Sequence, residues 1–197
     1  MYIKNTVLFK RFFDLILSSA LILLLSALIL LISVIIKFTS SGNIIYWSER
    51  IGRYEKPFLM PKFRTMKRDT PAVATHLLGD IEQHLTLPGK FLRKTSLDEL
   101  PQLYSIFKGD MSFVGPRPER DFFANQLIKK APHYKHIYRV KPGITSWGMV
   151  KFGYAENIDE MLERLKYDIL YIENMSLLID LKIMIHTVLI ILQGRGK

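Results

Sequence analysis

The stretch that decides the architecture of this chain is LILSSALILLLSALILLISVII, residues 15–36, in which every position is apolar or a serine. At about 1.5 Å per residue, a helix of this length could cross the roughly 30 Å hydrocarbon core of a bilayer. A buried core helix is the alternative, but a small domain has too little other chain to surround so uniform a helix. The run is too long for a signal-peptide core, and no small-residue cleavage site follows it. Residues 1–40 are therefore predicted to form a membrane-embedded N-terminal helix.

Positive charge flanks the apolar run on both sides, with Lys4, Lys10 and Arg11 before it and a series of lysines and arginines from Lys37 onward. Because such residues favour the cytoplasmic side of a membrane, both flanks are drawn to the same face. A straight span, in which one flank overrides the other, is one solution. A re-entrant helix, which enters the membrane and returns to the same face, satisfies both flanks. The hydroxyl of Ser26, in the middle of the run, could bend such a helix by bonding a backbone carbonyl.

The overall composition points to an anionic partner. The 197 residues carry a formal net charge of +10, and 49% of them are hydrophobic. Nucleic acid, an anionic membrane surface or phosphorylated substrates would each suit this charge. The absence of cysteine excludes disulfides and thiolate metal sites, and it is compatible with a reducing compartment.

After residue 40, apolar spacing and turn residues predict an α/β mixed, helix-rich fold. The last predicted helix, Leu177–Leu192, contains Asp180, Lys182 and His186, which argue against a second membrane span. It either packs on the core or lies at the membrane surface as an interfacial amphipathic helix. The other predicted elements are strands at Ile44–Trp47, Phe58–Phe63 and Ser112–Val114, turns at Gly52–Lys56 and Lys141–Gly143, a break at Leu87–Gly89, and helices at Thr70–Gln83, Leu97–Phe107, Arg120–Lys130 and Ile158–Glu173.

Two adjacent carboxylates, Asp98 and Glu99, lie in the segment FLRKTSLDELPQ, residues 91–102. One interpretation is structural, because Ser96 and Glu99 have the spacing of a helix capping box. Pro101 is awkward in that register, since a proline inside a helix removes a hydrogen bond. The helix would then begin nearer Pro101, with the two carboxylates on the entering turn. Beside the cations that precede it, an ionised carboxylate can be a nucleophile or a metal ligand.

Two further patches carry cations. Lys62 and Arg64 are two residues apart on a predicted strand, so both side chains are expected on one face. Arg117 lies between Pro116 and Pro118, which stiffen the backbone and can hold the guanidinium in place. A rigid surface turn is the plain alternative for this segment. The sequence contains no phosphate-binding glycine loop, dinucleotide fingerprint or serine-hydrolase elbow.

Together these patches resemble the bacterial sugar transferase family, the monotopic phosphoglycosyl transferases that start glycoconjugate and exopolysaccharide assembly. The matching motifs occur in the family's order: Lys10–Asp14 (KRFFD), Lys62–Met66 (KFRTM), Thr95–Gln102 (TSLDELPQ), Val114–Glu119 (VGPRPE) and Lys141–Thr145 (KPGIT). The family usually has Ser-Pro at the break of its apolar run, where this chain has Ser26-Ala27, and this departure bears on the re-entrant geometry. The last motif usually continues Gly-Trp, where this chain has Ser146-Trp147. Many family members are longer, so the chain is a minimal member or a fragment.

The resemblance implies an enzyme that moves a sugar-1-phosphate from a nucleotide-diphosphate sugar, usually a UDP-sugar, to a polyprenyl phosphate such as undecaprenyl phosphate. It implies that Asp98 is the nucleophile that holds the phosphosugar covalently, that Glu99 assists it, and that both hold Mg²⁺, with Mn²⁺ as a substitute. The implied phosphate-binding residues are Lys62, Arg64 and Arg93, and the implied nucleotide-binding residues are Arg117 and Glu119. Residues 41–197 would be the catalytic domain, facing the cytoplasm at the bacterial inner membrane, alone or as a homo-oligomer.

Two other functions fit part of the sequence. A basic, membrane-anchored scaffold or nucleic-acid-binding protein would suit the charge. However, no nucleic-acid motif is present and the aromatic residues do not form a stacking series among the basic ones, so we expect no nucleic-acid partner. A polytopic transferase, which attacks without a covalent intermediate, would need more spans than this sequence has. Nothing in the sequence specifies the sugar.

Overall fold

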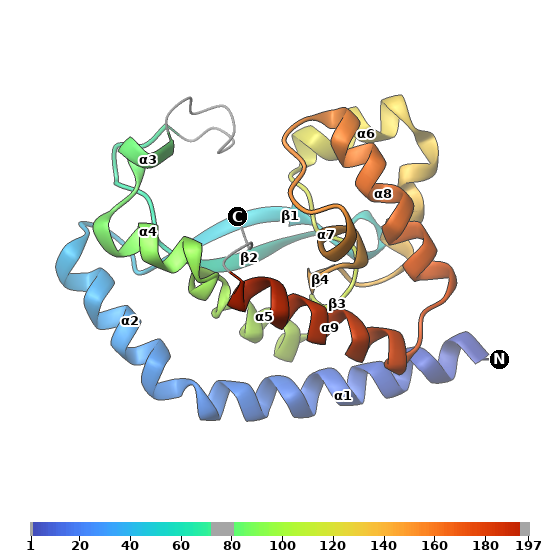
Figure 1. The fold of residues 1–197 in the computed structure, drawn as a ribbon, viewed down its shortest axis with the longest axis horizontal. Helices are drawn as coiled ribbons and strands as arrows, with labels where there is room; N and C mark the ends of the chain where they lie inside the picture. The colour runs from blue at the N-terminus through green and yellow to red at the C-terminus, as the bar shows by residue number, and fades with distance from the viewer. Residues whose placement is uncertain (1, 72–80, 194–197) are drawn as a thin grey trace.

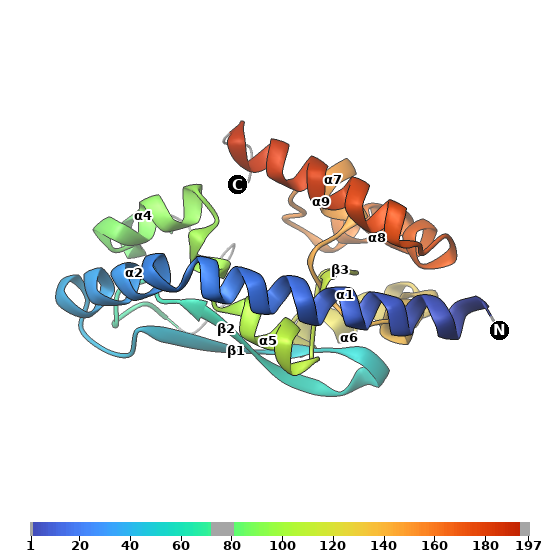
Figure 2. The ribbon, with the colours of Figure 1, turned by 90° about the horizontal axis from the view of Figure 1, so that it is seen from below.

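The computed structural model describes residues 2–71 and 81–193, and it confirms the predicted α/β mixed, helix-rich class. Figure 1 shows α1 and α2 along one edge, with the other elements packed on one side of them, and Figure 2 shows the same pair from below, running along the length of the molecule. The helices are α1 (Tyr2–Leu24), α2 (Ser26–Thr39), α3 (Ile81–His84), α4 (Leu87–Lys94), α5 (Gln102–Lys108), α6 (Asp121–Lys130), α7 (Trp147–Lys151), α8 (Ile158–Glu173) and α9 (Leu177–Leu192). The strands are β1 (Ile45–Ile51), β2 (Pro57–Phe63), β3 (Ser112–Val114) and β4 (Gly143–Thr145), and the 3₁₀ turns are η1 (Arg53–Glu55), η3 (Leu97–Glu99) and η4 (Pro132–Arg139).

The apolar run forms two helices, α1 and α2, which meet at Leu25 and are bent by 60°. Within the described residues, no single helix is long and apolar enough to cross a membrane, whereas this bent pair passes the same test of length and composition. The bend lies where the sequence predicted it. α2 begins at Ser26, whose hydroxyl donates a 2.8 Å hydrogen bond to the carbonyl of Leu23.

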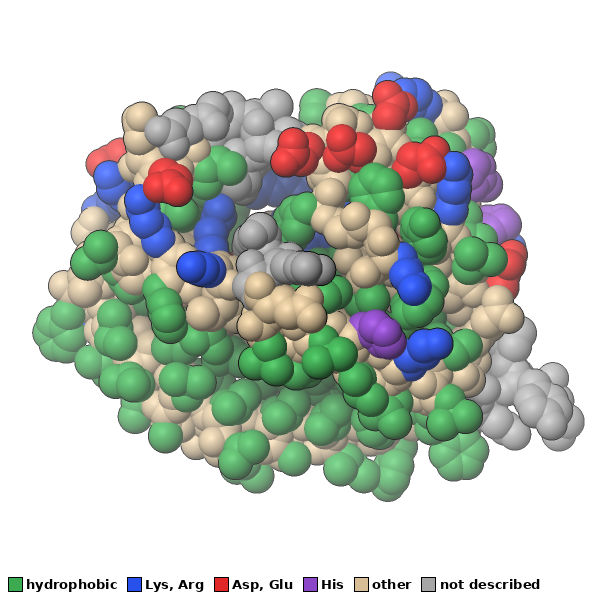
Figure 3. Space-filling model, in the orientation of Figure 1, with side chains coloured by type: hydrophobic (Ala, Val, Ile, Leu, Met, Phe, Trp, Pro, Cys, Tyr) green, Lys and Arg blue, Asp and Glu red, His purple; other side chains and the backbone are tan. Residues whose placement is uncertain are grey.

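One side of the bent pair is apolar and exposed. Figure 3 shows hydrophobic side chains gathered along the lower edge of the molecule, where α1 and α2 run. The opposite side of the pair packs on the domain through buried Ser18, Ile32 and Ile36. A contiguous apolar surface of this kind marks a site of contact with a membrane or another protein. Its exposed members are Leu8, Phe9, Phe12, Ile16, Leu23, Leu24, Leu30, Leu31, Val34, Ile35 and Phe38.

β1 and β2 form an antiparallel hairpin, in which Ile45 lies opposite Phe63 and Ile51 lies opposite Pro57. The hairpin confirms both predicted strands and the turn between them. β2 ends at Phe63, so Lys62 is the last cation on the strand and Arg64 follows it.

β3 and β4 pair in parallel, and this pairing positions the turn after β3 that contains Pro116, Arg117 and Pro118. The backbone approach is close at two glycines: a side chain on Gly143 would meet the nitrogen of Gly115 at 2.1 Å. The amide of Gly143 donates to the carbonyl of Pro116 at 3.0 Å, and that of Gly115 donates to the carbonyl of Thr145, also at 3.0 Å. The turn is therefore fixed by backbone contacts that only glycine permits.

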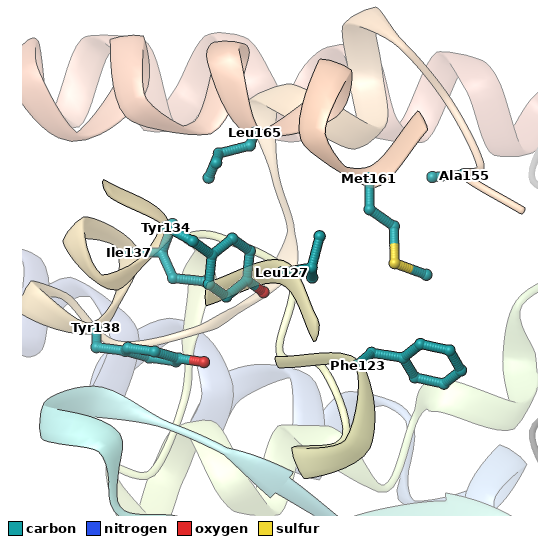
Figure 4. Close-up of a cluster of buried hydrophobic side chains, with 8 residues drawn as sticks. All are labelled: Phe123, Leu127, Tyr134, Ile137, Tyr138, Ala155, Met161 and Leu165. Atoms are coloured by element: carbon teal, nitrogen blue, oxygen red, sulfur yellow. The ribbon is translucent and has the colours of Figure 1, made fainter. Parts of the chain in front are cut away.

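Three buried hydrophobic clusters hold the described part of the domain together, and the smallest joins α2, β2 and α4 through Ile32, Ile36, Phe63 and Leu92. A larger cluster joins β2, α5, β3, α8 and α9, and Ile106, Met111 and Val114 are among its fully buried members. Because burying one large apolar side chain contributes about 1.5–3 kcal/mol, these contacts fix α5 and β3 relative to α9. The other large cluster comes mainly from α6, η4 and α8. Figure 4 shows its members: Phe123, Leu127, Tyr134, Ile137, Tyr138, Ala155, Met161 and Leu165.

α9 has a buried face and an exposed face. The sequence left open whether this helix packs on the core or lies at the membrane surface. Asp180 and Ile183 are buried against the domain, whereas Leu178, Leu181 and Leu192 are exposed. Asp180 forms a buried ion pair with Lys10 of α1 and accepts a 2.6 Å hydrogen bond from the hydroxyl of Tyr171. α9 therefore packs on the core and also presents an apolar face.

The predicted break at Leu87–Gly89 is wrong, because α4 begins there. The hydroxyl of Thr86 accepts a 3.1 Å hydrogen bond from the amide of Gly89, and Pro88 occupies the first turn, where its missing amide hydrogen is harmless. The predicted helix Thr70–Gln83 is helical only from Ile81 among its described residues, and residues 72–80 lie outside the described part. By contrast, α8 and α9 have the predicted bounds.

Candidate active site

The two adjacent carboxylates lie on η3, a single 3₁₀ turn between α4 and α5. The predicted capping box is wrong. Ser96 has a left-handed backbone conformation (φ 55°, ψ 16°), and its side chain makes no capping hydrogen bond within the described residues. The alternative register is confirmed, because α5 begins at Gln102 with Pro101 as its preceding residue. Asp98 and Glu99 are thus held on the turn that enters α5.

Lys62 reaches this turn from β2. Its ammonium group donates a 2.5 Å hydrogen bond to Oε1 of Glu99, and both side chains are largely shielded from solvent. Asp98 is more deeply buried, with only 3% of its surface exposed. Burying an anion is expensive unless nearby cations or donors compensate, so the surroundings of Asp98 decide what it can do.

Two arginines supply positive charge beside the carboxylates. Burial lowers the pKa of Arg93, while the charges of Asp98 and Glu99 oppose that change. Its Nε donates a 3.1 Å hydrogen bond to the hydroxyl of Thr65, which orients the guanidinium. Burial also acts to lower the pKa of Arg117, but Tyr154, Glu99 and other acidic groups outweigh it, and the net pKa is raised. Lys62, Arg93 and Arg117 therefore surround the Asp98–Glu99 turn.

Tyr154 belongs to this site, although sequence reasoning missed it. The guanidinium of Arg117 lies 5.4 Å from the centre of the Tyr154 ring, and its NH2 group is 3.5 Å from the phenol oxygen. Tyr154 also contributes to the electrostatic surroundings of Arg93. It is carried on the loop between α7 and α8, far from Arg117 in sequence and outside every motif, so no spacing pattern could have found it.

The structure places the other two predicted site residues differently. Arg64 lies beyond the end of β2 beside Gly42, and its Nε is buried with no hydrogen-bond partner in the described part of the chain. Glu119 is buried in an ion pair with Arg164 at 2.6 Å, with Arg50 at 3.8 Å. Its direct partners are therefore arginines of the protein, although its charge is felt by Arg117.

A divalent cation is compatible with this site. The described residues contain no group of three or more histidine, aspartate or glutamate side chains arranged to hold a metal ion. Mg²⁺, however, is commonly bound by one or two carboxylates together with substrate phosphates and water. Asp98 and Glu99 provide the hard oxygen atoms for such a shared site, so the residues present fit an ion that arrives with a phosphorylated substrate.

The structure thus combines a carboxylate turn, with cations beside it, and a bent apolar helix pair. The chain belongs to the bacterial sugar transferase family, whose family model matches residues 5–194. The match covers every motif on which the resemblance was based.

Individual relatives are similar over most of this chain. A UDP-N-acetylgalactosamine-undecaprenyl-phosphate N-acetylgalactosaminephosphotransferase of Aeromonas hydrophila is 36% identical over 187 residues, which are 95% of this chain and 44% of that protein. A UDP-glucose:undecaprenyl-phosphate glucose-1-phosphate transferase of Klebsiella pneumoniae is 39% identical over 92% of this chain and 40% of its own length. An uncharacterized sugar transferase of Bacillus subtilis, EpsL, is 36% identical over 96% of this chain and 90% of its own. The chain therefore spans less than half the length of the first two relatives.

Proposed function

We propose that this protein transfers a sugar-1-phosphate from a UDP-sugar to undecaprenyl phosphate, as the names of its relatives describe for those proteins. The observation that carries the proposal is the burial of Asp98 on a turn surrounded by Lys62, Arg93 and Arg117. Such a site suits a reaction in which one anion attacks another, because fixed cations neutralise the charge that develops. The product would initiate exopolysaccharide or glycoconjugate assembly.

The proposed reaction has two steps at one phosphorus atom. A carboxylate oxygen of Asp98 attacks the phosphorus that bears the sugar, and the bond from that phosphorus to the bridging oxygen breaks. The electron pair of this bond leaves with UMP, and the phosphosugar remains as an acyl phosphate on Asp98. A phosphate oxygen of the lipid then attacks the same phosphorus, releases the Asp98 carboxylate and forms the lipid-linked sugar diphosphate.

The surrounding residues have separate tasks in this proposal. Arg93 is oriented by Thr65 to contact the phosphate under attack, and Lys62 positions Glu99. Arg117, held by Tyr154, would bind the nucleotide side of the donor. Arg64 remains a candidate for a phosphate contact because its Nε lacks a hydrogen bond within the described residues. Glu119 would act through Arg117 rather than by touching the nucleotide.

The membrane arrangement is part of the same proposal. The bent pair α1–α2 would enter the inner membrane and return to the cytoplasmic face, and the domain from residue 41 would lie on that face. The exposed apolar faces of the bent pair and of α9 would then contact lipid. A lipid-linked acceptor could reach Asp98 without leaving the membrane surface.

The first test is the reaction with donor but no acceptor. Wild-type protein should release about one UMP per active site in a burst and gain the mass of a phosphosugar on the peptide that contains Asp98. Asp98→Asn keeps the size of the side chain but removes the anionic nucleophile, so the burst should fall by several orders of magnitude while donor binding persists. Direct transfer would be the better account if no adduct can be trapped and release requires donor and acceptor together.

The second test concerns the metal. When bound, Mg²⁺ or Mn²⁺ would neutralise the donor pyrophosphate and improve the leaving group, with Asp98 and Glu99 as its protein ligands. We expect excess EDTA to abolish turnover and added Mg²⁺ to restore it. Glu99→Gln should weaken the dependence of rate on Mg²⁺ concentration as well as the rate itself. Full turnover in excess EDTA would overturn the metal proposal and leave the Asp98 adduct to be judged separately.

A further inference from the structure

The guanidinium of Arg117 is held by residues that lie outside the catalytic turn. Its NH1 group is 3.4 Å from the sulfur of Met149 on α7, and its NH2 group is 3.5 Å from the phenol oxygen of Tyr154. Two residues after Arg117 the chain reaches Glu119, whose carboxylate is buried. The direction in which Arg117 points therefore depends on where α7 and the Glu119 segment lie.

The first support is a buried carboxylate shared by two arginines. The NH2 group of Arg164, on α8, donates a 2.6 Å hydrogen bond to Oε1 of Glu119. Arg50, on β1, lies 3.8 Å from Oε2 of Glu119 and donates a 3.3 Å hydrogen bond to the carbonyl of Pro118. The carbonyl of Glu119 accepts a further 3.1 Å bond from the amide of Ile51. Because moving either arginine would leave a buried charge without its partner, the segment that follows Arg117 is fixed in place.

The second support is the close packing of α7 on α8, which lie against each other in Figure 1. A side chain at Gly148 would lie 2.7 Å from Cγ of Arg164 and 2.9 Å from Oδ1 of Asp168. The same oxygen of Asp168 accepts a 2.9 Å hydrogen bond from the amide of Gly148. Met149 is the next residue, and Tyr154 follows on the loop after α7. Arg164 thus lies against both supports of the Arg117 guanidinium.

We propose that Arg164 is a positioning residue for the nucleotide diphosphate of the donor, and that it acts by holding Glu119 on one side of Arg117 and α7 on the other. Only 7% of the Arg164 side chain is exposed, and its guanidinium is engaged by Glu119, so it acts through Arg117 rather than on the substrate. A guanidinium that is already oriented loses less freedom when it binds a phosphate. The inference rests on the role of Arg117 in the proposed function.

The test is a double-mutant cycle between Arg164 and Arg117, in which calorimetry measures the Kd of UDP for the full chain in detergent, with Mg²⁺ in the buffer. Arg117→Ala should weaken UDP binding about tenfold or more, because it removes hydrogen bonds between charged groups. Arg164→Met keeps the apolar stem but loses the guanidinium, and it should weaken binding about fivefold. In the Arg117→Ala background the same change should leave Kd unchanged, because Arg164 then has nothing to position.

Three further variants separate positioning from folding. Arg164→Lys keeps the stem and the charge, so it should recover part of the affinity that Arg164→Met loses. Gly148→Ala keeps every charge but pushes α7 away from α8, and it should also weaken UDP binding, which provides a second test if Arg164→Met does not fold. Leu165→Ala is the matched control: it opens a cavity in the buried cluster beneath the next position of α8 and should lower the thermal midpoint while UDP binding stays as in wild type.

Several outcomes would overturn the proposal. An equal loss of affinity from Arg164→Met in both backgrounds would make its role structural only, as would a similar loss in Leu165→Ala. Unchanged affinity in both Arg164→Met and Gly148→Ala would have the same meaning. The donor-only burst of UMP is measured on wild type in parallel. If the burst occurs and the cycle is additive, only this inference fails; if Arg117→Ala binds UDP as wild type does, or wild type shows no burst, the proposed function fails.

Discussion

At the scale of single residues, Ser96 holds a left-handed backbone conformation two residues before Asp98. For a residue with a side chain this conformation costs roughly 1–2 kcal/mol, and it persists only where the surroundings impose it. Here the amide of Ser96 donates to the carbonyl of Arg93, and the carbonyl of Ser96 accepts from the amide of Glu99. The constrained backbone at Ser96 therefore limits how far Arg93 can move relative to Asp98 and Glu99.

Asp168 provides a residue-scale prediction about pH. Burial raises its pKa from 3.8 to about 6, against the opposing effects of a 2.9 Å hydrogen bond from the amide of Gly148 and of the nearby charge of Arg164. Between these two pH values the folded chain holds a proton that the unfolded chain has released. The free energy of unfolding should therefore fall as pH rises through this window.

The measurement is the thermal midpoint of the detergent-solubilised protein at a series of pH values from about 4 to about 7. Asp168→Asn cannot titrate and should flatten this part of the profile, although the charge of Glu119 remains nearby. A slope that is unchanged in Asp168→Asn would assign the pH dependence to another group.

At the scale of elements, the sequence predicted α8 and α9 best, because their apolar spacing is long and each begins after a capping residue, Asn157 and Ser176. The prediction from the sequence failed at α4, where Pro88 and Gly89 were interpreted as a break between helices. The hydroxyl of Thr86 makes that segment a helix start, and proline fits the first turn.

The site was predictable only where residues are close in sequence or carried by a motif. Asp98, Lys62, Arg93 and Arg117 come together as expected. The contact of Tyr154 with Arg117 depends on how the loop after α7 folds back, and the pairing of Glu119 with Arg164 depends on the packing of α8. Such contacts between distant segments have no periodicity that a single sequence can show.

The break between α1 and α2 gives an element-scale prediction. Ala27 is the second residue of α2, and proline is tolerated in the first turn of a helix. Ala27→Pro should therefore leave the yield of folded protein and the donor-only burst close to wild type. Ile16→Pro, inside α1, removes a helical hydrogen bond and should lower stability by about 3 kcal/mol. Comparable losses of thermal stability in the two variants would show that the helix is continuous at Ala27.

At the scale of the whole molecule, the re-entrant arrangement proposed for α1–α2 predicts that both ends of the pair face the cytoplasm. If α1–α2 is re-entrant, single cysteines introduced at Lys4 and Ser40 should both be shielded from an impermeant thiol reagent in intact cells and both react after permeabilisation. The native chain has no cysteine, so the background is low. A cysteine at Lys135, on the far side of the domain, is the cytoplasmic control. Labelling at residue 4 alone in intact cells would establish a straight span.

The buried ion pair between Lys10 and Asp180 has a consequence for the order in which the protein is made. The two residues are 170 positions apart, and Tyr171, which hydrogen-bonds to both, is also near the end of the chain. At about 5–20 residues per second, a ribosome needs roughly 10 to 30 s to add the partners of Lys10 after Lys10 itself. During that interval α1 must accommodate an uncompensated ammonium group close to its apolar run. A nascent chain stalled before α9 would therefore contain the Asp98–Glu99 turn but would lack Asp180, the partner that pairs with Lys10 of α1.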